Sequence, residues 1–528
     1  MRSRLTGLGP VTAVAIAQAL ALPQGDVDLA LMKLEGEGYV MRGRFTGEAL
    51  APGGAEEWCE RHLLARIHRY TIGKLRREIE PVEPRDFMRF LFDWQRVSKD
   101  ARVSGPEALA GVLTQLEGFE APAAAWETEL LPARISDYSI SWLDDLCTAG
   151  RVTWARLRSA PADATGNGRV APVRATPIVL LPRRQLATWS QAAASRNEDE
   201  PPLSSRAERV AEYLREHGAS FFDELVGGAH LLRTELEDAL AELVARGRVH
   251  CDSFAGLRAL LVPQSKRPSA FGGRRGRRTA LFGIEDAGRW TLTRRAAVLH
   301  PPLAGEGLGE ARGTTASQPS PASGGRRQAP ASARTRAVPA QASGGGSRAL
   351  SPPGVKTDPD TVEHIARTLL RRYGVVAWRL LEREAGWLPP WRELLRVYHR
   401  LEARGEIRGG RFIAGLSGEQ FALPEAIAAM RQVRKRPHDG ALIAVSALDP
   451  LNLVGTLLPG SKVPRQLGAR IAWRDGLPLG ALSGGQVEVL APLPPEDERA
   501  VRRLLLREPE SALADFAFPA TTQAGLPH

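Results

Sequence analysis

The chain has 528 residues, of which 43% are hydrophobic, and its 71 basic residues against 60 acidic ones give a net charge of +11. At roughly 150 residues per domain, this length predicts three or four domains that can bury sizeable cores. The excess of arginine suits phosphate-bearing partners, because a guanidinium can bind two phosphate oxygens at once. A general preference for arginine codons would produce the same excess, so both interpretations stay open.

The sequence argues against several classes of protein. Three distant cysteines, Cys59, Cys147 and Cys251, make neither a metal-binding spacing nor a disulfide framework. The first residues contain no signal-peptide region, and no apolar run approaches the ~20 residues of a membrane span. No GxxxxGK[ST] phosphate loop, HExxH motif or GxSxG elbow is present. We therefore expect a cytoplasmic protein with no motor, no metal, no cofactor and no membrane partner.

An internal repeat is the most informative feature of the sequence. The pattern Leu-x-x-x-Gly-x-Val/Ile ends four predicted helices, at residues 34–40, 146–152, 243–249 and 401–407. In each copy the Leu would be the last core contact of a helix, and the Gly would take the left-handed conformation that ends it. The β-branched residue would then begin a strand, and in three copies a hairpin with arginine follows. A helix, a glycine cap and a hairpin form the second half of a winged helix.

The predicted fold class is mainly α with small β (α+β), built from tandem winged-helix modules and a small C-terminal β-module. In chain order we expect a partial winged helix, a helical and winged-helix block, a winged helix, a basic segment with a disordered linker, a winged helix, and a small β-module with a closing helix. Their respective bounds are 1–50, 51–195, 196–265, 266–358, 359–436 and 437–528.

The segment before the fourth copy of the repeat has the composition of a linker. Residues 302–358 are rich in Pro, Ala, Ser and Gly, which cannot bury enough apolar surface to offset the entropy of ordering. Residues 266–278 hold six basic residues and no acidic one. A flexible Arg/Gly segment can follow a phosphate backbone by charge alone, or it can be only a solubilising connector, and the sequence leaves both open.

Basic side chains also gather on predicted structure. Winged helices commonly place their third helix in the major groove of DNA, although many bind only protein. A protein-interaction scaffold is therefore the alternative to DNA binding. If the partner is DNA, the predicted phosphate contacts come from the helical stretch at 56–82 and from the last hairpin: Arg66, Arg69, Lys74, Arg76, Arg77, Arg408 and Arg411.

Five strings of residues resemble the C-terminal region of Lhr, the large helicase-related family of bacteria: residues 66–82, 87–95, 105–135, 409–426 and 447–455. The resemblance covers nearly the whole chain apart from the linker. Lhr proteins carry an ATP-driven superfamily 2 motor, followed by winged helices, a β-barrel and a tandem winged-helix extension. The resemblance implies a DNA-binding portion of an ATP-dependent DNA helicase that begins inside a winged helix, lacks the motor and acts in DNA repair. Its partners would be DNA and a separate Lhr helicase core.

A fainter resemblance concerns chemistry. The Lhr extension is similar to winged-helix DNA glycosylases of the AlkZ type, which carry Gln-x-Gln near the end of an early helix. Asp93 stands here in place of the first Gln, and Gln95 matches the second. A carboxylate there implies activation of water or stabilisation of an oxocarbenium-like sugar during base excision.

The residues alone leave the role of this pair open. Asp93 can equally be a solvated helix residue and Gln95 a capping or packing residue. Residues two apart on a regular helix point about 200° apart, so Asp93 and Gln95 share a pocket only if the helix ends between them. The sequence thus predicts Asp93 and Gln95 as candidate catalytic residues without settling whether the chain is an enzyme.

Overall fold

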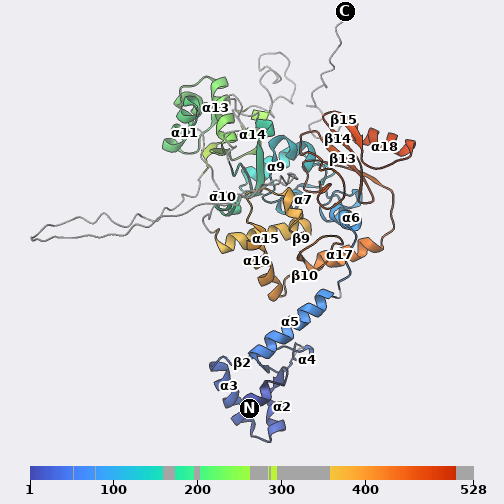
Figure 1. Ribbon diagram of the computed structural model, residues 1–528. Helices are drawn as coiled ribbons and strands as arrows, with labels where there is room; N and C mark the ends of the chain where they lie inside the picture. The colour runs from blue at the N-terminus through green and yellow to red at the C-terminus, as the bar shows by residue number, and fades with distance from the viewer. Residues whose placement is uncertain are drawn as a thin grey trace, which may run out of the picture.

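The computed structural model (Figure 1) describes residues 1–50, 53–77, 79–158, 173–194, 202–261, 284, 287–293 and 357–506. These residues form four winged-helix modules and a C-terminal β-sheet, and the predicted fold class, mainly α with small β, is confirmed. The basic segment at 266–278 and nearly all of the predicted linker at 302–358 lie outside the described residues.

The first module is a small winged helix with its own core. Its elements are α1 (Arg2–Leu5), β1 (Val11–Thr12), α2 (Ala13–Leu20), α3 (Gln24–Gly36), β2 (Val40–Gly43), α4 (Gly47–Leu50) and β3 (Glu57–Glu60). The strands pair in the order β1-β3-β2, and Ile16, Val27 and Leu31 are buried beneath them. Figure 1 shows that this N-terminal module stands apart and that α5 (Arg61–Arg77) joins it to the rest of the chain.

The second and third modules share one hydrophobic core. The second consists of α7 (Pro106–Gln115), β4 (Ala121–Pro122), α8 (Ala123–Ala125), a π-helix (Trp126–Leu130), α9 (Ile140–Thr148), β5 (Val152–Ala155) and β6 (Pro177–Pro182). After α10 (Leu186–Ala194), the third consists of α11 (Ser205–His217), α12 (Phe222–Gly228), α13 (Arg233–Ala245), β7 (Val249–Cys251), α14 (Phe254–Leu261) and β8 (Trp290–Leu292). Arg258 of α14 ties the two together, because its guanidinium donates to Glu127 and Asp144.

The fourth module and the β-sheet share another core with α6 (Pro84–Trp94). This module consists of α15 (Pro359–Tyr373), β9 (Val375–Ala377), a 3-10 helix (Leu380–Arg383), α16 (Trp391–Ala403), β10 (Arg408–Gly410) and β11 (Gln420–Ala422), and α17 (Pro424–Lys435) follows. An antiparallel meander then runs through β12 (Leu442–Ser446), β13 (Arg470–Arg474), β14 (Leu477–Ser483) and β15 (Gln486–Val489), covered by α18 (Pro495–Leu506). The aromatic face of α6 lies in this core and packs on α17.

The four glycines of the repeat have the predicted left-handed conformation. Their φ angles are +68° at Gly38, +68° at Gly150, +63° at Gly247 and +76° at Gly405. Each glycine follows the third helix of a module and precedes a strand. The interpretation of each glycine as a helix cap before a strand is therefore confirmed.

Two of these glycines provide a matched pair for mutation. A Cβ on Gly405 would meet nothing within 4 Å, whereas a Cβ on Gly247 would lie 2.5 Å from the backbone oxygen of Arg156 in the second module. We expect Gly405→Ala to lower the free energy of unfolding by about 1–2 kcal/mol through backbone strain alone. Gly247→Ala should lose a further ~1–3 kcal/mol, because the second and third modules must separate slightly. Urea unfolding measures both, and equal losses would contradict the close contact.

A buried histidine predicts a dependence of stability on pH. His250 in β7 is 8% exposed, and burial, helped by the charge of Arg183, lowers its pKa to about 4. The unfolded chain binds this proton near pH 6.5 and the folded chain does not, so stability is lost as the pH falls from 6.5 towards 4. The loss attributable to His250 should reach ~3 kcal/mol. Urea unfolding of His250→Gln should show a flatter profile over this range, and an unchanged profile would exclude His250 as the cause.

Candidate functional site

The end of α6 separates the two residues of the predicted pair. The helix ends at Trp94, Gln95 is its C-terminal cap, and Arg96 takes a left-handed φ of +63°. The chain then folds back, so that the hydroxyl of Ser98 donates to the carboxylate of Asp93. Because the helix stops here, Asp93 stays on its outer face while Gln95 turns inward.

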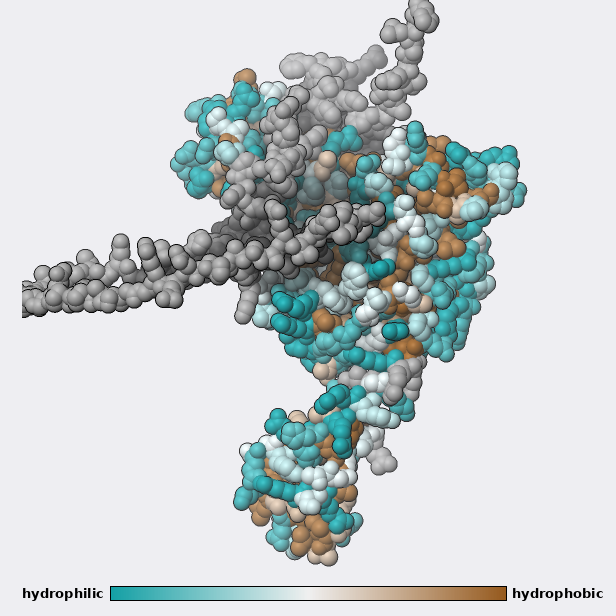
Figure 2. Space-filling view, in the orientation of Figure 1, coloured by the Kyte–Doolittle hydropathy of each residue, from teal (hydrophilic) through white to brown (hydrophobic). Residues whose placement is uncertain are grey.

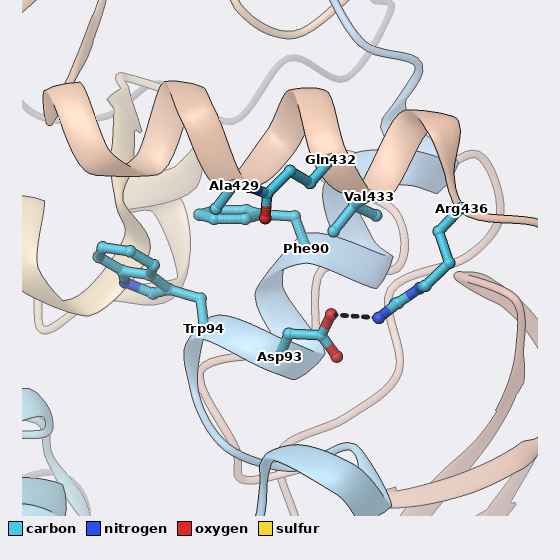
Figure 3. A pocket seen from close by; sticks show the side chains of 7 residues that line it. All are labelled: Phe90, Asp93, Trp94, Ala429, Gln432, Val433 and Arg436. Atoms are coloured by element: carbon cyan, nitrogen blue, oxygen red, sulfur yellow. Dashed lines mark ion pairs between the residues drawn. The ribbon is translucent and has the colours of Figure 1, made fainter.

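Asp93 lines a pocket of about 390 Å³ between α6 and α17. Figure 3 shows its carboxylate facing the guanidinium of Arg436, at the end of α17, and the two groups form an ion pair of 2.9 Å. The Asp93 side chain is 28% exposed, so solvent still reaches it. The seven lining residues are Phe90, Asp93, Trp94, Ala429, Gln432, Val433 and Arg436.

The chemistry of the lining is that of a site for a flat polar ligand. Trp94 supplies partly exposed aromatic surface, and the buried ring of Phe90 supports it, with the two ring centroids 5.3 Å apart. The Trp94 ring is held by its Nε1, which donates to the backbone oxygen of Arg371 at 2.9 Å. Gln432 offers an amide, and Asp93 is the single carboxylate among the seven lining residues. Rigid aromatic surface beside a few polar groups is typical of small-ligand sites.

Gln95 lies outside this pocket, in a buried polar network. Its side chain is fully buried, its Oε1 accepts from Arg134 at 2.9 Å, and its Nε2 donates to the backbone oxygen of Arg372 at 3.0 Å. Arg134 in turn forms two hydrogen bonds with Asp449, of 2.7 and 3.0 Å. The structure therefore does not bring Asp93 and Gln95 together, and Gln95 has the contacts of a packing residue.

The network predicts that Gln95 matters for stability. Gln95→Ala leaves the Arg372 carbonyl and one Arg134 nitrogen without this partner, and we expect a loss of about 1–3 kcal/mol in the free energy of unfolding. Asp93→Asn, at a partly exposed position on the same helix, is the matched control and should lose less than half as much. Urea titrations of both variants test this, and a neutral Gln95→Ala would contradict the network.

The predicted phosphate contacts fall into three groups. Arg66, Arg69 and Lys74 are exposed along α5. Arg408 and Arg411 are exposed on β10 and directly after it. The other two are Arg76, which is already paired with carboxylates, and Arg77, whose side chain lies outside the described part of the structure.

Arg76 is engaged within the protein. Its guanidinium bonds both carboxylate oxygens of Glu402 on α16 and lies 3.4 Å from Glu419. The hydrogen bond with Glu402 raises the pKa of Arg76 further above its ordinary value. Among the predicted contacts whose side chains are described, Arg76 is therefore the one found in an internal ion pair.

Three exposed arginines on α16 were missed by the sequence analysis. Arg392, Arg396 and Arg400 lie four residues apart, on one face of the third helix of the fourth module. Their spacing of four residues is visible in the sequence, but the phosphate contacts predicted in this module came only from the hairpin after the helix. That hairpin is held by the buried Gln420, whose Oε1 accepts from the backbone nitrogens of Phe412 and Ile413.

No group of three or more His, Cys, Asp or Glu side chains lies close enough to hold a metal ion within the described ranges. No helix in the same ranges is long and apolar enough to cross a membrane.

Two segments match known winged-helix domains. Residues 82–181 match the third winged-helix domain of large helicase-related protein (Lhr), and residues 356–442 match the fourth. The chain carries two winged-helix domains of the Lhr family. The resemblance drawn from the sequence is thereby confirmed. The pocket lies between these two Lhr domains, because α6 belongs to the first match and α17 to the second.

Two relatives extend the match over most of the chain. A protein of Mycolicibacterium smegmatis named Lhr helicase/probable uracil glycosylase is 27% identical over 482 residues, which are 89% of this chain and 27% of that protein. The Lhr helicase/uracil glycosylase of Escherichia coli is 25% identical over 539 residues, with 97% of this chain and 30% of that protein covered. The chain thus spans less than a third of the length of these Lhr relatives.

Proposed function

We propose that this Lhr-related chain binds DNA, acts in DNA repair, and excises a base in the pocket between α6 and α17. The observation that carries the proposal is the position of Asp93, which is the carboxylate of a pocket with an aromatic wall. The names of the two relatives, both of which include uracil glycosylase, support the same chemistry. Base excision needs neither a metal nor a nucleotide triphosphate.

The residues of the pocket have distinct roles in this proposal. A nucleotide turned out of the duplex would place its base against the partly exposed ring of Trp94, and Gln432 would hydrogen-bond the edge of the base. The bond between C1′ and the base nitrogen breaks, and its electron pair leaves with the base, which then takes a proton. The Asp93 carboxylate stabilises the positive charge on the sugar and accepts a proton from the water that adds to C1′.

An abasic-site assay on duplexes with uracil or an alkylated purine tests this reaction. Asp93→Asn keeps the shape of the side chain but removes its charge, so we expect the rate of excision to fall by about 10²–10⁴-fold. DNA affinity should stay within a few fold, because Arg436 remains. Ser98→Ala, which loses only the hydroxyl bonded to Asp93, is the milder control. Equal rates in wild type and Asp93→Asn would remove Asp93 from the mechanism.

A second candidate function is a scaffold that docks a protein such as a separate Lhr helicase core. The N-terminal module favours it, because Leu22, Leu29 and Met32 are 47%, 65% and 53% exposed. Figure 2 shows hydrophobic surface at the end of this module that points away from the rest of the chain. A salt titration with a fluorescent duplex separates the two functions, since a pure scaffold would show no salt-dependent affinity for DNA.

A further inference from the structure

The third helices of the four modules differ in charge, and the first three suit DNA poorly. In a winged helix the third helix is the element that commonly meets DNA. That of the second module, α9, carries Asp144 and Asp145, and that of the third, α13, carries Glu237 and Asp238 next to each other. The third helix of the first module, α3, has an exposed apolar face instead. None of these three helices carries more than one lysine or arginine.

The third helix of the fourth module has the opposite character. Arg392, Arg396 and Arg400 follow one another along a single exposed face of α16. None of the three forms an ion pair with a carboxylate among the described residues. Successive arginines are about 6 Å apart along the helix axis at 1.5 Å per residue, so the row is about 12 Å long. This is close to the width of the major groove, about 12 Å.

A second basic helix, α5, contacts the side of α16 with its C-terminal turn. The C-terminal turn of α5 is fixed on the fourth module by Arg76, which pairs with Glu402 of α16 and with Glu419. The contact is close, because a Cβ on Gly409 would lie 2.7 Å from the guanidinium of Arg76. Glu402 is only 9% exposed, so this pairing also neutralises an acidic side chain of α16.

The rest of α5 continues the positive charge towards the N-terminal module. Residues 61–77 contain no Asp or Glu, and Arg66, Arg69 and Lys74 are exposed. No carboxylate partner of these three occurs among the described residues. At 1.5 Å per residue, the 17 residues of α5 span about 25 Å. Figure 1 shows α5 running from the N-terminal module to the part of the fourth module around β10.

We propose that α5 and α16 form one continuous track for the phosphate backbone of duplex DNA, held together by the ion pairs of Arg76. The duplex lies across the row of arginines on α16 and continues along α5 towards the N-terminal module. The proposal rests on the DNA binding proposed above and does not depend on base excision.

The occupant is a duplex and not a single strand. Proteins that hold single strands stack successive bases on exposed aromatic rings. Among the Phe, Tyr and Trp side chains described on α5 and α16, Tyr70 is the one with large exposure, at 67%. One ring does not make a stacking platform, whereas a row of cations without carboxylates suits the regular phosphates of a duplex.

The track is tested with two triple variants and a matched control. One removes the charges of α16 (Arg392→Gln, Arg396→Gln, Arg400→Gln), and the other removes those of α5 (Arg66→Gln, Arg69→Gln, Lys74→Gln). The control removes three exposed charges elsewhere on the chain (Arg209→Gln, Arg215→Gln, Arg503→Gln). Affinity for a duplex of about 24 base pairs is measured against salt concentration. Each track variant should lower the slope of log K against log salt by about 2.7, at roughly 0.9 per lost contact. The control should keep the slope of the wild type.

Length and strandedness complete the test. On a duplex of about 6 base pairs, only one part of the track fits, so the wild-type slope should be smaller and one of the triple variants should have little effect. If only one triple variant changes the slope on the long duplex, the continuous track is wrong. If both variants behave like the control while the wild type binds, the inference fails and DNA binding survives. If the wild type shows no salt-dependent binding, the proposed DNA binding itself fails. Tighter binding of a single strand than of the duplex would overturn the choice of occupant.

Discussion

The buried ion pair between Arg134 and Asp449 is the constraint on which the arrangement around the pocket depends. Their side chains are 0% and 1% exposed, and they come from the second module and from the loop after β12. Removing one partner of such a pair leaves an uncompensated buried charge, at a cost of about 3–5 kcal/mol. The pair is therefore satisfied only when the second module, the end of α6 and the β-sheet meet in one arrangement.

This arrangement positions the end of α6 without using the side chain of Asp93. Gln95 joins Arg134 to the backbone of Arg372, and Gln115 donates to the backbone oxygen of Trp94 at 2.7 Å. These bonds hold the residues on both sides of the helix end. The Asp93 carboxylate is partly exposed to solvent and pairs with one counter-ion, Arg436. A fixed backbone with an accessible carboxylate is what a reactive site requires, since its geometry must not depend on the reacting group.

Local features of this structure were predictable from sequence, and contacts between distant residues were not. The glycine caps follow from neighbouring residues, because the left-handed conformation and the last helical turn lie within a few positions of each other. The possible end of α6 beside Asp93 could be recognised for the same reason, because the residues that end a helix lie close to it in the chain. The partners of Gln95 were not predictable, because Arg134 and Arg372 are 39 and 277 positions away and no local pattern marks them. The ion pair of Arg76 could not be predicted either, since its partner Glu402 lies 326 positions away.

The arginines of the chain differ in what they contribute, because some are buried in ion pairs and others are exposed to solvent. Arg134, Arg258 and Arg372 are nearly fully buried, and each faces a carboxylate. They hold modules together and contribute little to the field outside the protein, because their charges are compensated at short range. A phosphate backbone meets the remaining arginines, which are exposed and have no carboxylate partner among the described residues. In the described fourth module Arg392, Arg396 and Arg400 form a row on one helix face, so the position of the charge, more than its sum, identifies the surface that suits DNA.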